Sequence, residues 1–306
     1  MERTMTERHT TFTCAVDGGE LTAAIWEPES EPRGTILLIH GITASHMSWP
    51  LIAAAFPDCR VIAPDLRGRG ASRDLPAPFG MPQHAKDMDA LLAATGTDSA
   101  LVVGHSMGAF VAATLAAQYP ERVSSLLLID GGLPIPAPEG VSMEDLPQVI
   151  LGPAVDRLSM TFADRESYQE FWRVHPAFAD NFTEAIRDYV DYDLVGTAPE
   201  LHPASNLAAV SFDALQLSGD TDYLAGLRGL TMPVHFIRAP RGLLNQVPAL
   251  YSPEECDRWR SELPHVTFSE AADVNHYTIT LTQRGADGVA DVITEILANQ
   301  PREVRA

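Results

Sequence analysis

One serine has neighbours that could make its hydroxyl a nucleophile. Ser106 is the centre of the pentapeptide Gly-His-Ser-Met-Gly at 104–108, which follows an apolar run typical of a strand and precedes an alanine-rich stretch typical of a helix. Glycines at this spacing allow a tight strand-to-helix turn that projects the serine hydroxyl above the end of the strand. The start of the helix would supply N–H groups for a developing oxyanion. We therefore predict that Ser106 is a catalytic nucleophile.

A serine hydroxyl needs a base to take its proton, and His276 is the histidine in the best position to do so. It follows the last predicted strand and precedes the last predicted helix. Because the carboxyl ends of parallel strands meet at one edge of a sheet, His276 can approach Ser106 despite their separation in sequence. Other histidines have different expected places: His40 shapes the loop after its strand, His105 points away from the site, and His84 lies at the surface or caps a helix.

The elements that must position these residues follow a strand–helix rhythm. Short apolar runs alternate with helical patterns over 35–129 and again over 234–299. This alternation predicts an α/β fold with a mostly parallel sheet and helices on both faces. Two alternating segments, 10–16 and 21–26, are joined by Asp-Gly-Gly and predict an N-terminal hairpin.

Between these two parts the rhythm stops. Residues 134–230 contain many prolines and most of the aromatic side chains, in patterns typical of helices and loops. The sequence thus predicts a sheet domain formed by 1–133 and 231–306, with residues 134–230 inserted into it as a helical cap.

Several motifs together resemble the α/β-hydrolase superfamily, and the resemblance covers nearly the whole chain. The motifs are His40-Gly41, the segment Asp65-Leu66-Arg67-Gly68-Arg69-Gly70, the turn around Ser106, the helical insertion and the late His276. The resemblance implies an α/β-hydrolase fold and an oxyanion hole formed by the backbone N–H groups of Ile42 and Met107. Asp65 is expected to hold its own loop together.

The third catalytic group departs from the common pattern of the superfamily. Many relatives carry the acid that orients the histidine in the loop after the penultimate strand, but here the loop 239–246 has no carboxylate. Asn245 in that loop could hold an imidazole but could not comparably stabilise its charged form. A second arrangement known in the superfamily has the acid one strand earlier, where Asp130 precedes two glycines. We predict that Asp130 is the acid; the alternatives are Asp213, Asp220 and Asp222.

The insertion suggests the kind of substrate. An apolar cap over a nucleophile favours an apolar substrate and excludes water from the site. Trp172, His175 and Phe178 are the predicted substrate contacts, although an aromatic stripe can equally be the core of the cap. An early acid together with a cap of this size also resembles the hydrolases that open the macrolactone zearalenone.

The resulting hypothesis is a carboxylic ester hydrolase or lactonase for a bulky, largely apolar small molecule. It needs neither a metal nor an organic cofactor. The alternatives are a hydrolase that cleaves a C–C bond, and a ligand receptor that uses the same pocket without catalysis. Ser106 argues against dehalogenation and epoxide opening, because in this superfamily both reactions need an aspartate at that position.

Charge and composition exclude some partners. A net charge of −20 leaves no basic surplus for nucleic acid or for an anionic membrane surface. No apolar run approaches the roughly 18 residues of a membrane-spanning helix. Three scattered cysteines, Cys14, Cys59 and Cys256, favour reduced thiols, and the N-terminal residues lack the apolar stretch of a secretion signal. We therefore expect a cytoplasmic protein.

Overall fold

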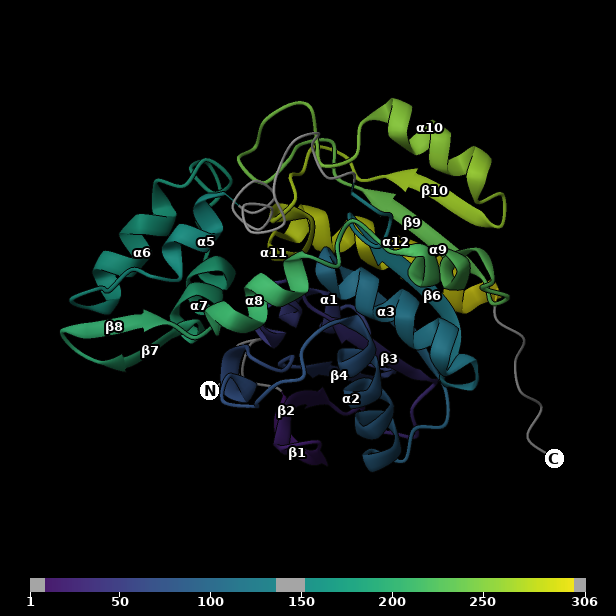
Figure 1. The fold of residues 1–306 in the computed structure, drawn as a ribbon, viewed down its shortest axis with the longest axis horizontal. Coiled ribbons are helices and arrows are strands. Elements are labelled where there is room, and N and C mark those ends of the chain that lie inside the picture. The colour runs from purple at the N-terminus through teal and green to yellow at the C-terminus, as the bar shows by residue number, and fades with distance from the viewer. Residues whose placement is uncertain (1–8, 136–151, 300–306) are drawn as a thin grey trace.

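The computed structural model describes residues 9–135 and 152–299, and its centre is an eight-stranded sheet (Figure 1). The strand order is β1-β2-β4-β3-β5-β6-β9-β10. β1 and β2 form the predicted hairpin, β2 pairs antiparallel with β4, and every later pair is parallel. The strands are β1 (Thr10–Val16), β2 (Gly19–Trp26), β3 (Thr35–Ile39), β4 (Arg60–Pro64), β5 (Ala100–His105), β6 (Val123–Ile129), β9 (Val234–Arg238) and β10 (Val266–Glu270).

Both faces of this sheet are covered by helices, as the strand–helix rhythm predicts. Neighbouring side chains of a strand point to opposite faces, so that Leu37 and Ile39 join one apolar cluster while Ile36 and Leu38 join the other. The helices of the first face are α2 (Met81–Ala94), α3 (Met107–Gln118), α9 (Thr221–Arg228) and α10 (Pro253–Glu262). Those of the second are α1 (Pro50–Ala53), α11 (Thr278–Leu281) and α12 (Gln283–Asn299).

The residues predicted to form a cap pack in two different environments. α6 (Arg165–Arg173) and α7 (Glu184–Tyr192) lie to one side of the sheet, next to the short α5 (Pro153–Arg157) (Figure 1). Side chains of α6 and α7 belong to a third apolar cluster. In contrast, α8 (Leu207–Ala214) and α9 contribute side chains to the cluster on the first face of the sheet. The predicted division into a sheet domain and a single cap stays a prediction.

This region also contains strands that the sequence pattern did not indicate. β7 (Leu194–Thr197) pairs antiparallel with β8 (Glu200–Pro203), where helices and loops were expected. Each strand has only four residues, and β7 also contains Gly196, so the alternation is too short to be recognised from sequence.

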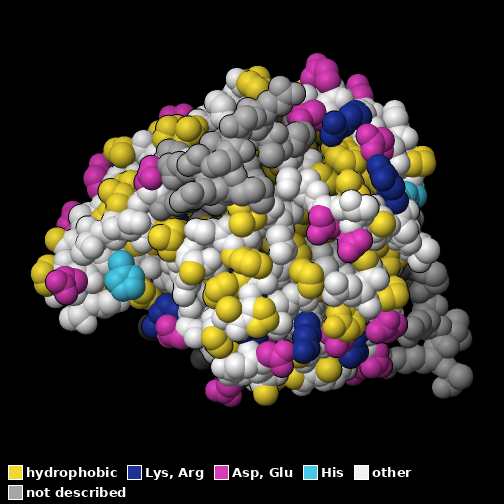
Figure 2. All heavy atoms as spheres, viewed as in Figure 1, with side chains coloured by type: hydrophobic (Ala, Val, Ile, Leu, Met, Phe, Trp, Pro, Cys, Tyr) yellow, Lys and Arg dark blue, Asp and Glu magenta, His cyan; other side chains and the backbone are white. Residues whose placement is uncertain are grey.

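Acidic side chains are spread over the face of the molecule seen in Figure 2. Figure 2 shows Asp and Glu side chains around the visible face rather than in one patch, as expected from the net charge of −20. Within the described residues, no helix has both the length and the apolar character needed to cross a membrane.

Candidate active site

Ser106 occupies a strained turn between β5 and α3. Its φ of 54° and ψ of −124° lie in a region that non-glycine residues seldom adopt. A Cβ at Gly108 would lie 2.1 Å from Ile39 O, and one at Gly104 would lie 2.3 Å from Gly108 O. Both glycines are therefore required, because they let α3 pack directly against the strands. This close packing explains the Gly-His-Ser-Met-Gly pattern.

Asp130 and His276 are joined by a short hydrogen bond. His276 Nδ1 lies 2.7 Å from Asp130 Oδ2, and both residues are buried. The other carboxylate oxygen, Oδ1, accepts a bond of 3.0 Å from the N–H of Ala239, which fixes the rotation of the carboxylate. The backbone at Asp130 also has a positive φ of 44°, directly after β6. A carboxylate held in this way can orient an imidazole and stabilise its charged form.

The alternative partners for His276 are engaged elsewhere. Asn245 Oδ1 accepts bonds from Arg241 Nε at 2.7 Å and from Asn275 Nδ2 at 3.2 Å. Asp213 pairs with Arg69 and His84. Asp220 caps α9, and Asp222 lines a separate hollow between α2, α3 and α9. Among the described carboxylates, Asp130 is the one hydrogen-bonded to His276.

Ser106 and His276 line the same cavity, at the carboxyl ends of the strands. No hydrogen bond joins the two side chains within the described structure, and such contacts are often looser before substrate binds. Apolar side chains form much of the wall, together with two tyrosines. The described residues around the cavity are Gly41, Ile42, Thr43, Ala44, Ser48, His105, Ser106, Ala154, Tyr189, Leu243, His276, Tyr277, Thr280 and Leu281.

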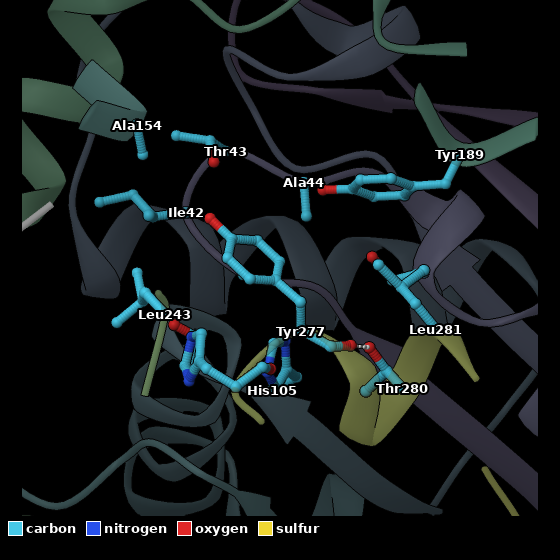
Figure 3. Close-up of a pocket in the computed structure, with 14 residues that line it drawn as sticks. Ile42, Thr43, Ala44, His105, Ala154, Tyr189, Leu243, Tyr277, Thr280 and Leu281 are labelled. Atoms are coloured by element: carbon cyan, nitrogen blue, oxygen red, sulfur yellow. Dashed lines mark hydrogen bonds between the residues drawn. The ribbon is translucent and has the colours of Figure 1, made fainter. Parts of the chain in front are cut away.

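His105 differs from its expected orientation. It lines the cavity (Figure 3) instead of pointing away, and its Nε2–H donates to the backbone carbonyl of His276 at 2.8 Å. Burial and the neighbouring His276 lower the pKa of His105 well below its ordinary value, so the ring stays neutral. The expectation was wrong because His105 and Ser106 lie on a sharp turn rather than on a regular strand, where neighbouring side chains alternate.

The backbone N–H groups of the predicted oxyanion donors, Ile42 and Met107, make no hydrogen bond to any residue that the structure describes. Ile42 lines the cavity and Met107 begins α3. First-turn N–H groups of a helix lack partners within the helix. Both groups are thus available to bind an oxyanion.

His40 sets the orientation of the Ile42 N–H. The N–H of Leu66 donates to His40 Nε2 at 2.9 Å, so the ring proton must be on Nδ1. Nδ1–H then donates to Gly41 O at 2.7 Å. The Gly41 carbonyl and the Ile42 N–H belong to the same trans peptide and point in opposite directions. By holding the carbonyl, His40 turns the N–H the other way.

Asp65 is occupied within its own surroundings, as expected. Its oxygens accept bonds from His46, from the N–H of Ala71 at 2.8 Å and from the hydroxyl of Tyr192 at 2.6 Å. Burial raises the pKa of Asp65, but the hydrogen bond and charge of His46 outweigh this effect and hold the pKa at about 2.

The three predicted substrate contacts lie behind another aromatic residue. The ring centroids of Trp172, His175 and Phe178 are 6.0, 5.9 and 5.4 Å from that of Tyr277. Figure 3 shows Tyr277 crossing the middle of the cavity. Trp172, His175 and Phe178 are not among the residues that line the cavity. Tyr277 was not predicted from sequence as a residue of the cavity wall, although its position directly after the predicted base, His276, could have indicated it.

Two phenol hydroxyls enter this mostly apolar cavity. In Figure 3 the hydroxyl of Tyr277 points toward Ile42 and that of Tyr189 toward Ala44. Neither hydroxyl makes a hydrogen bond within the described part of the chain, so both can bind a ligand. In residues 9–135 and 152–299, no three His, Cys, Asp or Glu side chains are grouped to hold a metal ion.

Comparison with known proteins gives three informative similarities besides a family match. Residues 34–171 match the family described as α/β-hydrolase fold. The chain is 28% identical to 2-(acetamidomethylene)succinate hydrolase of Mesorhizobium japonicum over 263 residues, 86% of this chain and 87% of that protein. It is 39% identical to lipase LipV of Mycobacterium tuberculosis over 95 residues, which are 31% of this chain and only 36% of the lipase. A crystal structure of E-2-(acetamidomethylene)succinate hydrolase superposes with a TM-score of 0.73 at 25% identity, covering 95% of this chain and 99% of that one.

The buried neutral His40 makes folding depend on pH. Burial lowers its pKa to about 4, whereas in the unfolded chain it titrates near 6.5. Between these values the unfolded chain binds the proton and the folded protein does not, so stability falls as the pH falls. We expect the free energy of unfolding in urea to drop by about 2 kcal/mol from this group between pH 7 and pH 5.

His40→Gln is the control, because glutamine keeps a donor and an acceptor but does not titrate. It should be less stable at pH 7 and should show a smaller difference between the two pH values. An equal pH dependence in both proteins would contradict the assignment to His40.

Proposed function

Because this chain belongs to the α/β-hydrolase superfamily, we propose that it is a serine hydrolase that cleaves a carboxylic ester or lactone. The proposed triad is Ser106, His276 and Asp130. The observation that carries the proposal is the 2.7 Å bond between Asp130 and His276 beside a cavity that Ser106 also lines.

The proposed reaction transfers an acyl group to water in two steps. Ser106 Oγ attacks the substrate carbonyl carbon while His276 Nε2 takes its proton, since Nδ1 is engaged by Asp130. The N–H groups of Ile42 and Met107 bind the oxyanion. His276 returns the proton to the leaving alcohol oxygen, which gives an acyl-enzyme. His276 next takes a proton from water, whose oxygen attacks the acyl carbon, and the carboxylic acid leaves as Ser106 regains its proton.

The cavity wall supports a largely apolar substrate. Ile42, Leu243 and Leu281 provide apolar contacts, while the hydroxyls of Tyr189 and Tyr277 provide a few polar ones, a mixture typical of small-molecule sites. The described residues that line the cavity include no Lys or Arg, which favours an uncharged substrate over an acidic one. A bulky macrolactone of the zearalenone kind remains one proposal within this class.

Ser106→Ala should abolish turnover of an aryl ester and leave the fold intact, because only one hydroxyl is lost. Stoichiometric labelling by a fluorophosphonate, followed by intact-protein mass spectrometry, should disappear in the same variant. Labelling that persists would overturn the assignment of the nucleophile. A wild-type protein that binds apolar esters without cleaving them would favour the receptor alternative.

Asp130→Asn should lower kcat by a factor on the order of 10⁴, because the amide cannot stabilise a charged imidazole in the required tautomer. The matched control is Asn245→Ala, which removes a side chain of the loop after β9 whose hydrogen bonds go to Arg241 and Asn275 and not to His276. Steady-state kinetics on one aryl ester should show a small effect for the control. A larger effect at Asn245 than at Asp130 would refute the assigned acid.

A substitution at Trp172 tests the size of the substrate, because the Trp172 ring packs against Tyr277 on the side away from the cavity. We expect Trp172→Ala to raise KM for a bulky ester or macrolactone more than for a small acetate ester, because only the larger ligands reach the Tyr277 ring, which loses its fixed position without Trp172. Kinetics on a panel of aryl esters, small lactones and macrolactones tests this expectation. Equal changes in KM across the panel would indicate general damage to packing. Cleavage of short acyl esters alone would exclude the lactone branch.

A further inference from the structure

A fully buried arginine contacts both residues of the proposed oxyanion hole. Arg69 lies in the loop after β4, and its Nε donates to Ile42 O at 2.8 Å. Its Nη2 lies 3.8 Å from Met107 Sδ. Its Nη1 donates to Arg67 O at 2.8 Å, so the guanidinium also braces its own loop. One rigid planar group thus connects three segments of the chain: the loop after β3, the loop after β4 and the start of α3.

The charge of Arg69 is balanced by Asp213 of α8. Arg69 Nη1 lies 2.5 Å from Asp213 Oδ2, and both side chains are fully buried. Asp213 also accepts bonds from Gly80 N–H at 2.7 Å and from His84 Nε2 at 2.9 Å. His84 is therefore buried in this network and not at the surface as expected. Burial raises the pKa of Asp213, but Arg69 and His84 outweigh it and lower the pKa to about 2, so the carboxylate stays charged.

Together with His40, Arg69 holds the peptides on both sides of Ile42. His40 binds the carbonyl of Gly41, and Arg69 binds the carbonyl of Ile42 itself. Rotating the Gly41–Ile42 peptide so that its N–H leaves the cavity would break the His40 bond to Gly41 O. Turning the adjoining Ile42–Thr43 peptide with it would also break the Arg69 bond to Ile42 O. Leaving a buried guanidinium without its partners is costly. The N–H orientation needed for oxyanion binding is thus kept before substrate arrives.

We infer that Arg69, anchored by Asp213, is a positioning residue that fixes the oxyanion hole. The inference rests on the proposed function, because it assumes that the Ile42 and Met107 N–H groups bind an oxyanion. It also gives α8 a role in the site: the carboxylate that anchors Arg69 comes from the region predicted as the cap.

The chain contains a matched control two residues earlier. Arg67 is equally buried and forms a two-pronged ion pair with Asp87, with Nε–Oδ2 and Nη2–Oδ1 distances of 2.9 Å. It also donates to Pro76 O at 2.8 Å. Its side chain makes no hydrogen bond to Ile42 or Met107 within the described residues. A substitution at Arg67 therefore disturbs a similar buried ion pair without touching the oxyanion peptides.

The experiment compares Arg69→Lys with Arg67→Lys in the full chain. A lysine keeps the charge but lacks the fork of donors needed to serve Asp213 and Ile42 O together. Both variants should show a lower Tm. Arg69→Lys should lower kcat on an aryl ester by a factor on the order of 10², similar to the loss of one oxyanion donor, with little change in KM. Arg67→Lys should change kcat only a few-fold.

An aryl boronic acid, which forms a tetrahedral adduct with an active serine, supplies the second measurement. The affinity of the protein for the boronic acid should fall in Arg69→Lys by about the same factor as kcat. In Arg67→Lys this affinity should stay close to the wild-type value. Asp213→Asn, which keeps an acceptor but removes the charge, should weaken boronate binding and kcat in the same direction. If Arg69→Lys does not fold, the kcat and boronate affinity of Asp213→Asn test the inference in its place.

Equal losses of kcat at Arg69 and Arg67, or a loss at Arg69 with unchanged boronate affinity, would overturn the inference while leaving the serine hydrolase intact. A wild-type protein without Ser106-dependent turnover would instead remove the proposed function, and the inference with it.

Discussion

The proposed site depends on how closely backbones can approach one another at the Ser106 turn. α3 begins directly after this serine, and it can pack against the sheet only because Gly104 and Gly108 carry no Cβ. Gly131, after β6, is under the same constraint, since a Cβ there would lie 2.2 Å from Ser106 O. The turn therefore brings the segment that contains Asp130 against the segment that contains Ser106. Any larger residue at these glycines would separate them.

The loops around this turn are held by buried charge. Asp65 and Asp213 are fully buried carboxylates, and each is surrounded by hydrogen-bond donors from several elements. Buried charges of this kind persist only when they are fully paired, and losing one partner is then expensive. The loop after β4 consequently has little freedom. Through Arg69, its rigidity extends to the peptides of Ile42, which the proposed mechanism needs in one orientation.

The aromatic cluster beside the sheet has a related effect on Tyr277 and the segment next to it, which line the same cavity. Trp172, His175 and Phe178 pack on Tyr277, and Tyr277 follows the histidine of the proposed triad. His105 supports the same segment by donating to the carbonyl of His276. The position of the imidazole is thus determined by contacts from both the sheet and the aromatic cluster. Changes in that cluster can reach the proposed base without contacting it.

The fold and the turn at Ser106 could be predicted from sequence because their signals are local. Strand–helix alternation and the two glycines of the pentapeptide involve residues close together in the chain, and the backbone conformation they favour is set by those neighbours. The contact between Asp130 and His276 could also be anticipated, since both follow strands that end at the same edge of a parallel sheet. Their catalytic roles, and those of Ile42 and Met107, stay predictions.

Tertiary structure alone decided which side chains surround these residues. Asp213 of α8 pairs with Arg69 and binds His84, which is 129 residues away from it in sequence. Both contacts depend on how α8 packs against the rest of the protein. The place of Trp172 behind Tyr277 likewise depends on the packing of a separate apolar cluster. Sequence periodicity can show that an aromatic residue will be buried, but it does not show which residues it will pack against. That choice is made by the shapes of surfaces that meet only after the chain has folded.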